Sequence, residues 1–124
     1  QFEARLVMVE VLESPSILLN DMTGSKIPVV VAHGEGRTST GLTTNAALRY
    51  VDNAGNPTQI YPMNPNGSSE GLTGFSNDDG RFTIMMPHPE RVFLRKQFSY
   101  LPNSWRHEYS PWIKMFLNAR HWLD

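Results

Sequence analysis

Residues 71–86 read GLTGFSNDDGRFTIMM, in which two apolar runs flank the polar stretch Asn77–Gly80. Asn, Asp and Gly are the residues that tight turns favour, so this segment predicts a β-hairpin. A similar pattern occupies residues 48–61, where the two runs are separated by Asn53–Asn56. The chain also has nine glycines and nine prolines, which favour short strands joined by turns over long helices.

Outside the two hairpins, the pattern predicts two longer strands and a terminal helix. Residues 6–11 and 26–32 are apolar runs, and the second is expected to be covered on both faces. Ser110 and Pro111 suit the N-cap and the first position of a helix. An apolar stripe at helical spacing follows, made of Trp112, Met115, Phe116, Ala119 and Leu123. We therefore expect an α/β fold in which a mixed sheet of five or six strands, with short hairpins, is packed by a C-terminal helix.

Composition excludes several classes of function. Eleven Lys and Arg against twelve Asp and Glu in 124 residues give a formal net charge of −1, so no global field attracts nucleic acid or an anionic membrane. No apolar run approaches the roughly 18 residues that a membrane span needs. The sequence contains no cysteine, which excludes disulfides, thiolate metal sites and a thiol nucleophile within these residues.

The strongest candidate site lies in Met85–Arg91, which reads MMPHPER. Pro87 and Pro89 cannot donate to a sheet ladder, so this segment should lie beyond the hydrogen-bonded part of the sheet. Side chains two apart in an extended segment point the same way, which places His88 beside Glu90. A carboxylate that accepts one ring N–H leaves the other ring nitrogen free as a base. A solvated surface loop is the alternative interpretation.

A second candidate, His33–Arg37, reads HGEGR and directly follows an apolar strand. Its two glycines permit a ligand to approach the backbone closely, whereas a tight turn with solvated charges is the alternative. Together, His33, Glu35, His88 and Glu90 are ligand types of a zinc site. They lack the helical spacing of a zinc hydrolase, so we expect no metal.

These segments closely resemble the phosphoribosylformylglycinamidine synthases, in particular the C-terminal end of their long single-chain form. The resemblance runs in the same order over nearly all 124 residues. It is carried by residues 2–5, 14–16, 33–37, 50–53, 64–68, 85–91, 110–112 and 118–120. It implies the flavodoxin-like α/β fold of a class I, triad-type glutaminase domain. Residues 1–124 would then be the C-terminal portion of that domain, truncated on its N-terminal side.

The resemblance also implies an activity and its residues. Enzymes of this family use ATP and glutamine to convert formylglycinamide ribonucleotide to the amidine. His88 matches the catalytic histidine and Glu90 the acid that orients it. By a weaker match, His33, Glu35 and Arg37 belong to a loop that contributes to substrate binding beside the glutaminase pocket. The cysteine of the family's Cys–His–Glu triad would lie upstream, so we expect the isolated chain to be inactive.

The resemblance implies that this segment holds no cofactor and no metal, and that ATP and magnesium belong to the missing synthetase domains. The expected partners are glutamine and the upstream portions of the same polypeptide, with no nucleic acid and no membrane, in the cytoplasm. Two alternatives remain open at this point. One is a non-catalytic docking or regulatory module derived from a glutaminase, and the other is a metal hydrolase.

Overall fold

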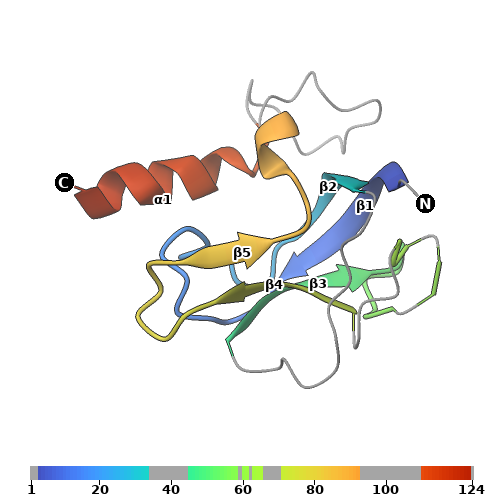
Figure 1. Cartoon of the computed structure of the whole chain (residues 1–124), viewed down its shortest axis with the longest axis horizontal. Helices are drawn as coiled ribbons and strands as arrows, with labels where there is room; N and C mark the ends of the chain where they lie inside the picture. The colour runs from blue at the N-terminus through green and yellow to red at the C-terminus, as the bar shows by residue number, and fades with distance from the viewer. Residues whose placement is uncertain are drawn as a thin grey trace.

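A computed structural model of the chain describes residues 3–33, 45–58, 60–61, 63–65, 71–92 and 110–123. Within these residues, five strands form one sheet in the order β2-β1-β3-β4-β5 (Figure 1). The elements are β1 (Glu3–Val11), β2 (Lys26–His33), β3 (Ala46–Val51), β4 (Leu72–Ser76), β5 (Thr83–Met85), the 3-10 helix η2 (Pro89–Arg91) and α1 (Ile113–Leu123). The expected fold class, α/β with short hairpins and a terminal helix, is confirmed.

All the ladders in the described part of the sheet are antiparallel. The predicted hairpin of residues 71–86 is the β4–β5 pair, and its turn is closed by Asn77, whose backbone exchanges hydrogen bonds with Phe82 and Gly80. In the other predicted hairpin, Asp52 begins the turn, but in the described part of the returning segment the pairing is an isolated bridge between Val51 and Pro57. The expected mixed sheet therefore shows no parallel ladder among these residues.

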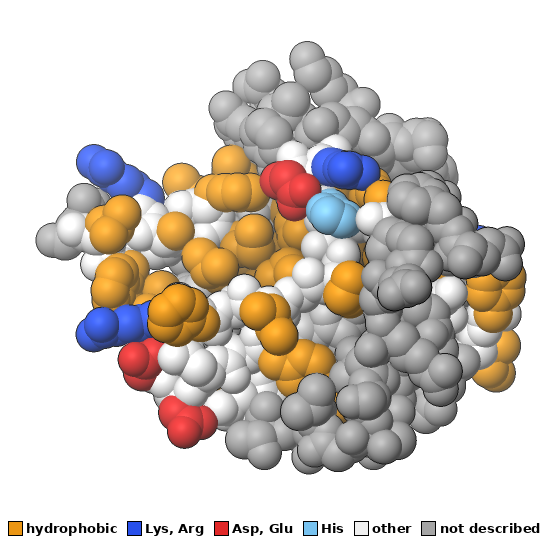
Figure 2. Space-filling view, viewed as in Figure 1, with side chains coloured by type: hydrophobic (Ala, Val, Ile, Leu, Met, Phe, Trp, Pro, Cys, Tyr) orange, Lys and Arg blue, Asp and Glu red, His pale blue; other side chains and the backbone are white. Residues whose placement is uncertain are grey.

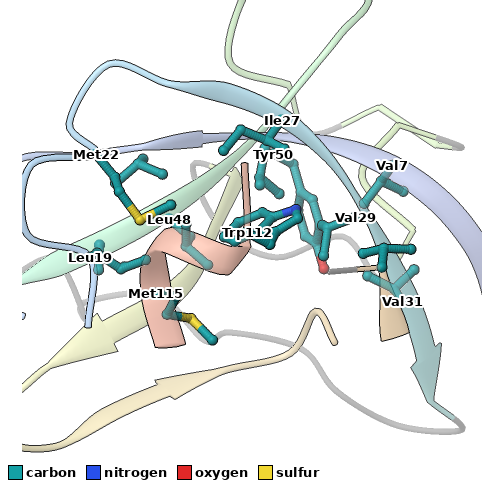
Figure 3. Close-up of a cluster of buried hydrophobic side chains, with 14 residues drawn as sticks. Val7, Leu19, Met22, Ile27, Val29, Val31, Leu48, Tyr50, Trp112 and Met115 are labelled. Carbon is teal, nitrogen blue, oxygen red and sulfur yellow. The ribbon is translucent and has the colours of Figure 1, made fainter. Parts of the chain in front are cut away.

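The core lies between one face of the sheet and the start of α1. Figure 3 shows Trp112 in the middle of the buried cluster, with Leu48 and Val29 on either side of it. Along β2, Val29 and Val31 are fully buried, while Val30 is only partly buried. The expectation that this strand is covered on both faces is therefore wrong for the described residues. β2 is an edge strand of the sheet, and its burial alternates as in a strand with one packed face.

Helix α1 follows the predicted capping but buries a different stripe. The Ser110 hydroxyl accepts a hydrogen bond from the Trp112 backbone N–H at 3.2 Å, as an N-cap does. Trp112 and Met115 are buried as expected, whereas Phe116 is 40% and Leu123 is 73% exposed. Asn118 takes the third buried position because its amide donates to two carbonyls of the segment that follows β1, at 2.9 and 2.7 Å.

The other faces of α1 and β5 carry exposed apolar side chains. Figure 2 shows hydrophobic side chains gathered along α1 and β5, on the face that is turned toward the viewer. The exposed large hydrophobic residues include Ile84 of β5, Phe82 directly before it, and Leu117 and Trp122 of α1. In the described part of the chain, no helix has the length and apolar character that crossing a membrane requires.

Candidate active site

The segment after β5 contains the candidate site, and it runs from one edge of the sheet, at β5, to the other edge, at β2. Met86 still donates to the Thr73 carbonyl of β4 at 3.1 Å, and Pro87 then ends the ladder. The backbone N–H of His88 donates to the carbonyl of Val30 on β2 at 2.7 Å. Since β5 and β2 are the two outer strands in the strand order, the sheet must curl until its edges are spanned by this short segment (Figure 1).

The imidazole of His88 and the carboxylate of Glu90 lie in direct contact. His88 Nδ1 and Glu90 Oε2 are 3.0 Å apart, and the two side chains are 33% and 56% exposed. The predicted side-by-side placement is therefore confirmed. His88 lies outside the helical region as expected, with φ −117° and ψ 80°. The expectation of an extended backbone is wrong from Pro89 onward, where a single 3-10 turn begins and Arg91 N–H donates to the carbonyl of His88 at 3.1 Å.

This geometry defines what the pair can do chemically. When the Nδ1–H donates to the Glu90 carboxylate, the lone pair of the imidazole is on Nε2. Nε2 can then accept a proton from a nucleophile, and the carboxylate stabilises the positive charge that the ring acquires. Because the histidine side chain is one-third exposed, a substrate or a nucleophile from outside the described residues can reach it.

Two further groups hold this turn in place, and sequence reasoning missed both. One is the carbonyl of Val30, for which no sequence signal exists, since every residue carries a carbonyl. The other is Ser110, whose hydroxyl donates to the carbonyl of Val92 at 2.6 Å, directly after η2. The serine is recognisable in the sequence as an N-cap, but its second bond is to a residue far away along the chain.

The second candidate segment is described only at its first residue. His33 is the last residue of β2, and its backbone pairs with Glu3 of β1. It therefore lies on the strand whose Val30 carbonyl holds His88. Glu35 and Arg37 lie outside the described residues, so their predicted role beside the substrate stays a prediction.

Within the described residues, His88 and Glu90 belong to no cluster of metal-ligating side chains. No group of three or more His, Asp and Glu side chains gathers in this part of the chain. One cavity lies between the segment 14–20 and the end of α1, and another lies against β1 near Arg5 and Met8. Neither is lined by His88 or Glu90.

Two comparisons with known proteins bear on this geometry. The family model of the CobB/CobQ-like glutamine amidotransferase domain matches residues 1–123. The chain is also similar to a chain in the structure of PurLQS from Thermotoga maritima, with 27% sequence identity and a TM-score of 0.72. The match covers 100% of this chain and 49% of that one, so the present sequence spans about half the length of its structural relative.

Proposed function

Because the chain belongs to the CobB/CobQ-like glutamine amidotransferase domain family, we propose that it provides the base and the orienting acid of a glutaminase active site in a phosphoribosylformylglycinamidine synthase. The observation that carries this proposal is the 3.0 Å contact between His88 Nδ1 and Glu90 Oε2 on a partly exposed turn. The similarity to PurLQS supports the link to this enzyme.

In the proposed reaction, His88 Nε2 takes the proton of a cysteine thiol, and the thiolate attacks the side-chain amide carbon of glutamine. The histidine then returns the proton to the departing nitrogen, so that ammonia leaves and a glutamyl thioester remains for hydrolysis by water. Glu90 keeps the ring in the tautomer that presents the Nε2 lone pair, and it stabilises the imidazolium. The cysteine must come from outside these residues, since the sequence contains none.

We further propose that the ammonia serves the ATP-dependent conversion of formylglycinamide ribonucleotide to the amidine, as a cytoplasmic step. The synthetase part, with its ATP and magnesium, would be a partner of this chain, in the same polypeptide in the long form of the enzyme. The described residues offer no cluster of carboxylates or histidines for magnesium, so the proposal routes no step of that chemistry through them.

The proposal is tested in the intact enzyme with His88→Ala. Glutamine-dependent synthesis should be lost, while synthesis from added ammonium should continue at the normal rate, because ammonium bypasses the glutaminase. His121→Ala is the matched control, since this histidine lies exposed on the last turn of α1. If glutamine-dependent turnover survives in His88→Ala, the histidine is not the base. That result would agree with the alternative, a non-catalytic docking or regulatory module.

A further inference from the structure

The outer edge of β2 has two carbonyl groups that are bound by groups from outside the sheet. Residues two apart in a strand direct their carbonyls to the same edge. The carbonyl of Val30 accepts the backbone N–H of His88 at 2.7 Å, and the carbonyl of Pro28 accepts the indole N–H of Trp112 at 2.8 Å. The turn 88–91 that carries His88 and Glu90 (the catalytic turn) and the segment 110–112 directly before α1 are thus attached to successive outward carbonyls of one strand.

The indole is well suited to fix this edge. Trp112 is fully buried, and Figure 3 shows its ring among Tyr50, Leu48 and Val29. A ring that is packed on all sides cannot rotate away from its acceptor, and its N–H has no water to bond with instead. Pro28 adds to the rigidity, because its own ring fixes φ.

A second connection runs from Trp112 to the far end of the catalytic turn. The backbone N–H of Trp112 donates to the hydroxyl of Ser110 at 3.2 Å, and that hydroxyl donates to the carbonyl of Val92 at 2.6 Å. Val92 is the residue directly after η2 and is itself buried. The pair His88 and Glu90 therefore lies between two fixed points, the bond to the Val30 carbonyl and the bond to the Val92 carbonyl. Trp112 is connected to the first through the edge of β2 and to the second through Ser110.

We propose, on the basis of the proposed function, that Trp112 is a positioning residue for glutamine hydrolysis, which holds the His88 imidazole in place through the outer edge of β2. Trp112 does not touch the reacting atoms in this arrangement. Removal of its N–H lets the Pro28–Val30 edge and the attached turn shift. A misplacement of about 1 Å at a reacting group can lower a rate by about 100-fold.

The test measures the intact enzyme with Trp112→Phe and with benzothienylalanine at position 112. The second variant keeps the bicyclic shape of the indole and has sulfur in place of the N–H, so it decides the question if Trp112→Phe fails to fold. We expect the kcat of glutamine-dependent synthesis to fall by about 10- to 100-fold. The KM for glutamine and the rate with ammonium should stay near those of the unmodified enzyme. Trp122→Phe, which changes an exposed tryptophan of α1, is the matched control and should leave all three values unchanged.

Two outcomes overturn the proposal. Either an unchanged kcat with glutamine in the isosteric variant, or equal losses with glutamine and with ammonium, would assign Trp112 to general stability alone. His88→Ala is measured beside it to separate this proposal from the proposed function. If His88→Ala is inactive with glutamine and the isosteric variant keeps the kcat of the unmodified enzyme, only the positioning role fails. If His88→Ala retains turnover with glutamine, the proposed function fails as well.

Discussion

The backbone N–H of His88 lies 2.7 Å from the carbonyl oxygen of Val30, although Val30 lies in β2 and His88 follows β5, the strand at the opposite end of the strand order. His88 is only three residues beyond the end of β5 at Met85. Three residues span at most about 10 Å, so the free edges of β5 and β2 must approach each other to within that distance. The curl of the sheet is therefore a condition for placing the histidine, and contacts that fix the curl should affect the site.

The tip of the β4–β5 hairpin makes one such contact, with residues 15–17. Gly80 has a φ of +77°, and a Cβ atom built on it would lie 1.9 Å from the carbonyl oxygen of Pro15. Its own carbonyl accepts the backbone N–H of Ile17 at 3.0 Å. We expect Gly80→Ala to separate the hairpin from residues 15–17 and to destabilise it by at least about 2 kcal/mol, from the dihedral penalty together with the clash.

Hydrogen–deuterium exchange of the intact enzyme measures this effect, with faster exchange expected in residues 15–17 and 71–86. Gly24→Ala is the matched control, because Gly24 has a similar φ of +88° but no atom within 4 Å of the added Cβ. It should cost only the dihedral penalty, about 1 kcal/mol. Equal effects of the two substitutions would show that the contact between Gly80 and Pro15 has no role in holding the hairpin.

The sequence predicted local structure better than it predicted the contacts between distant segments. The β4–β5 turn and the Ser110 cap were predictable because each depends on residues within a few positions of one another. The side-by-side placement of His88 and Glu90 was also predicted, although the backbone that produces it is a 3-10 turn. The curl of the sheet was not predictable, since a bond from His88 to Val30 uses only backbone atoms.

The face of α1 that packs on the core was likewise not predictable from the sequence pattern. Periodicity predicted a stripe of apolar residues that includes Phe116 and Leu123, whereas the structure buries Asn118 and exposes both of them. Because asparagine is a polar residue, the hydrophobic pattern predicts that its side chain is exposed to solvent. Its burial depends on the two carbonyls of Leu18 and Asn20, which no periodicity along the helix can reveal.

Acid should weaken the β4–β5 turn through Asp79. The backbone N–H of Arg81 is the main cause that holds the pKa of the Asp79 carboxyl below its usual value of 3.8; desolvation opposes it, and the side-chain amide of Asn77 and the charge of Arg81 lower the pKa further. A carboxyl whose pKa is lower in the folded state stabilises that state above its unfolded pKa. This contribution is lost as the pH falls below 3.8 through the folded value. Asp79→Asn should therefore show a weaker loss of stability in acid.

Urea unfolding of the two proteins at a series of pH values between neutral and strongly acidic conditions measures this difference. The midpoints should differ most at neutral pH and converge below the folded pKa of Asp79, because both side chains are then uncharged. Midpoint curves that stay parallel over the whole range would mean that the ionisation of Asp79 does not contribute to stability.

Glu90 should matter for catalysis far more than its exposure suggests. Its carboxylate lies 3.0 Å from His88 Nδ1, so Glu90→Gln removes the negative charge that favours the imidazolium. The new amide can also donate its N–H to Nδ1, which favours the wrong tautomer of the ring. Removal of the orienting acid in triad enzymes lowers kcat by up to about 10⁴-fold. Glu90 is 56% exposed and solvent can replace part of its effect, so we expect a loss of about 10²- to 10³-fold with glutamine. Synthesis from ammonium should be unchanged.

The matched control is Glu13→Gln, which removes the same charge from an exposed position between β1 and β2. Combination with His88→Ala makes the assignment specific. If Glu90 acts only through the imidazole, adding Glu90→Gln to His88→Ala should leave the background rate with glutamine unchanged, because the ring that it orients is gone. A full multiplicative loss in the double variant would instead assign Glu90 a direct contact with glutamine.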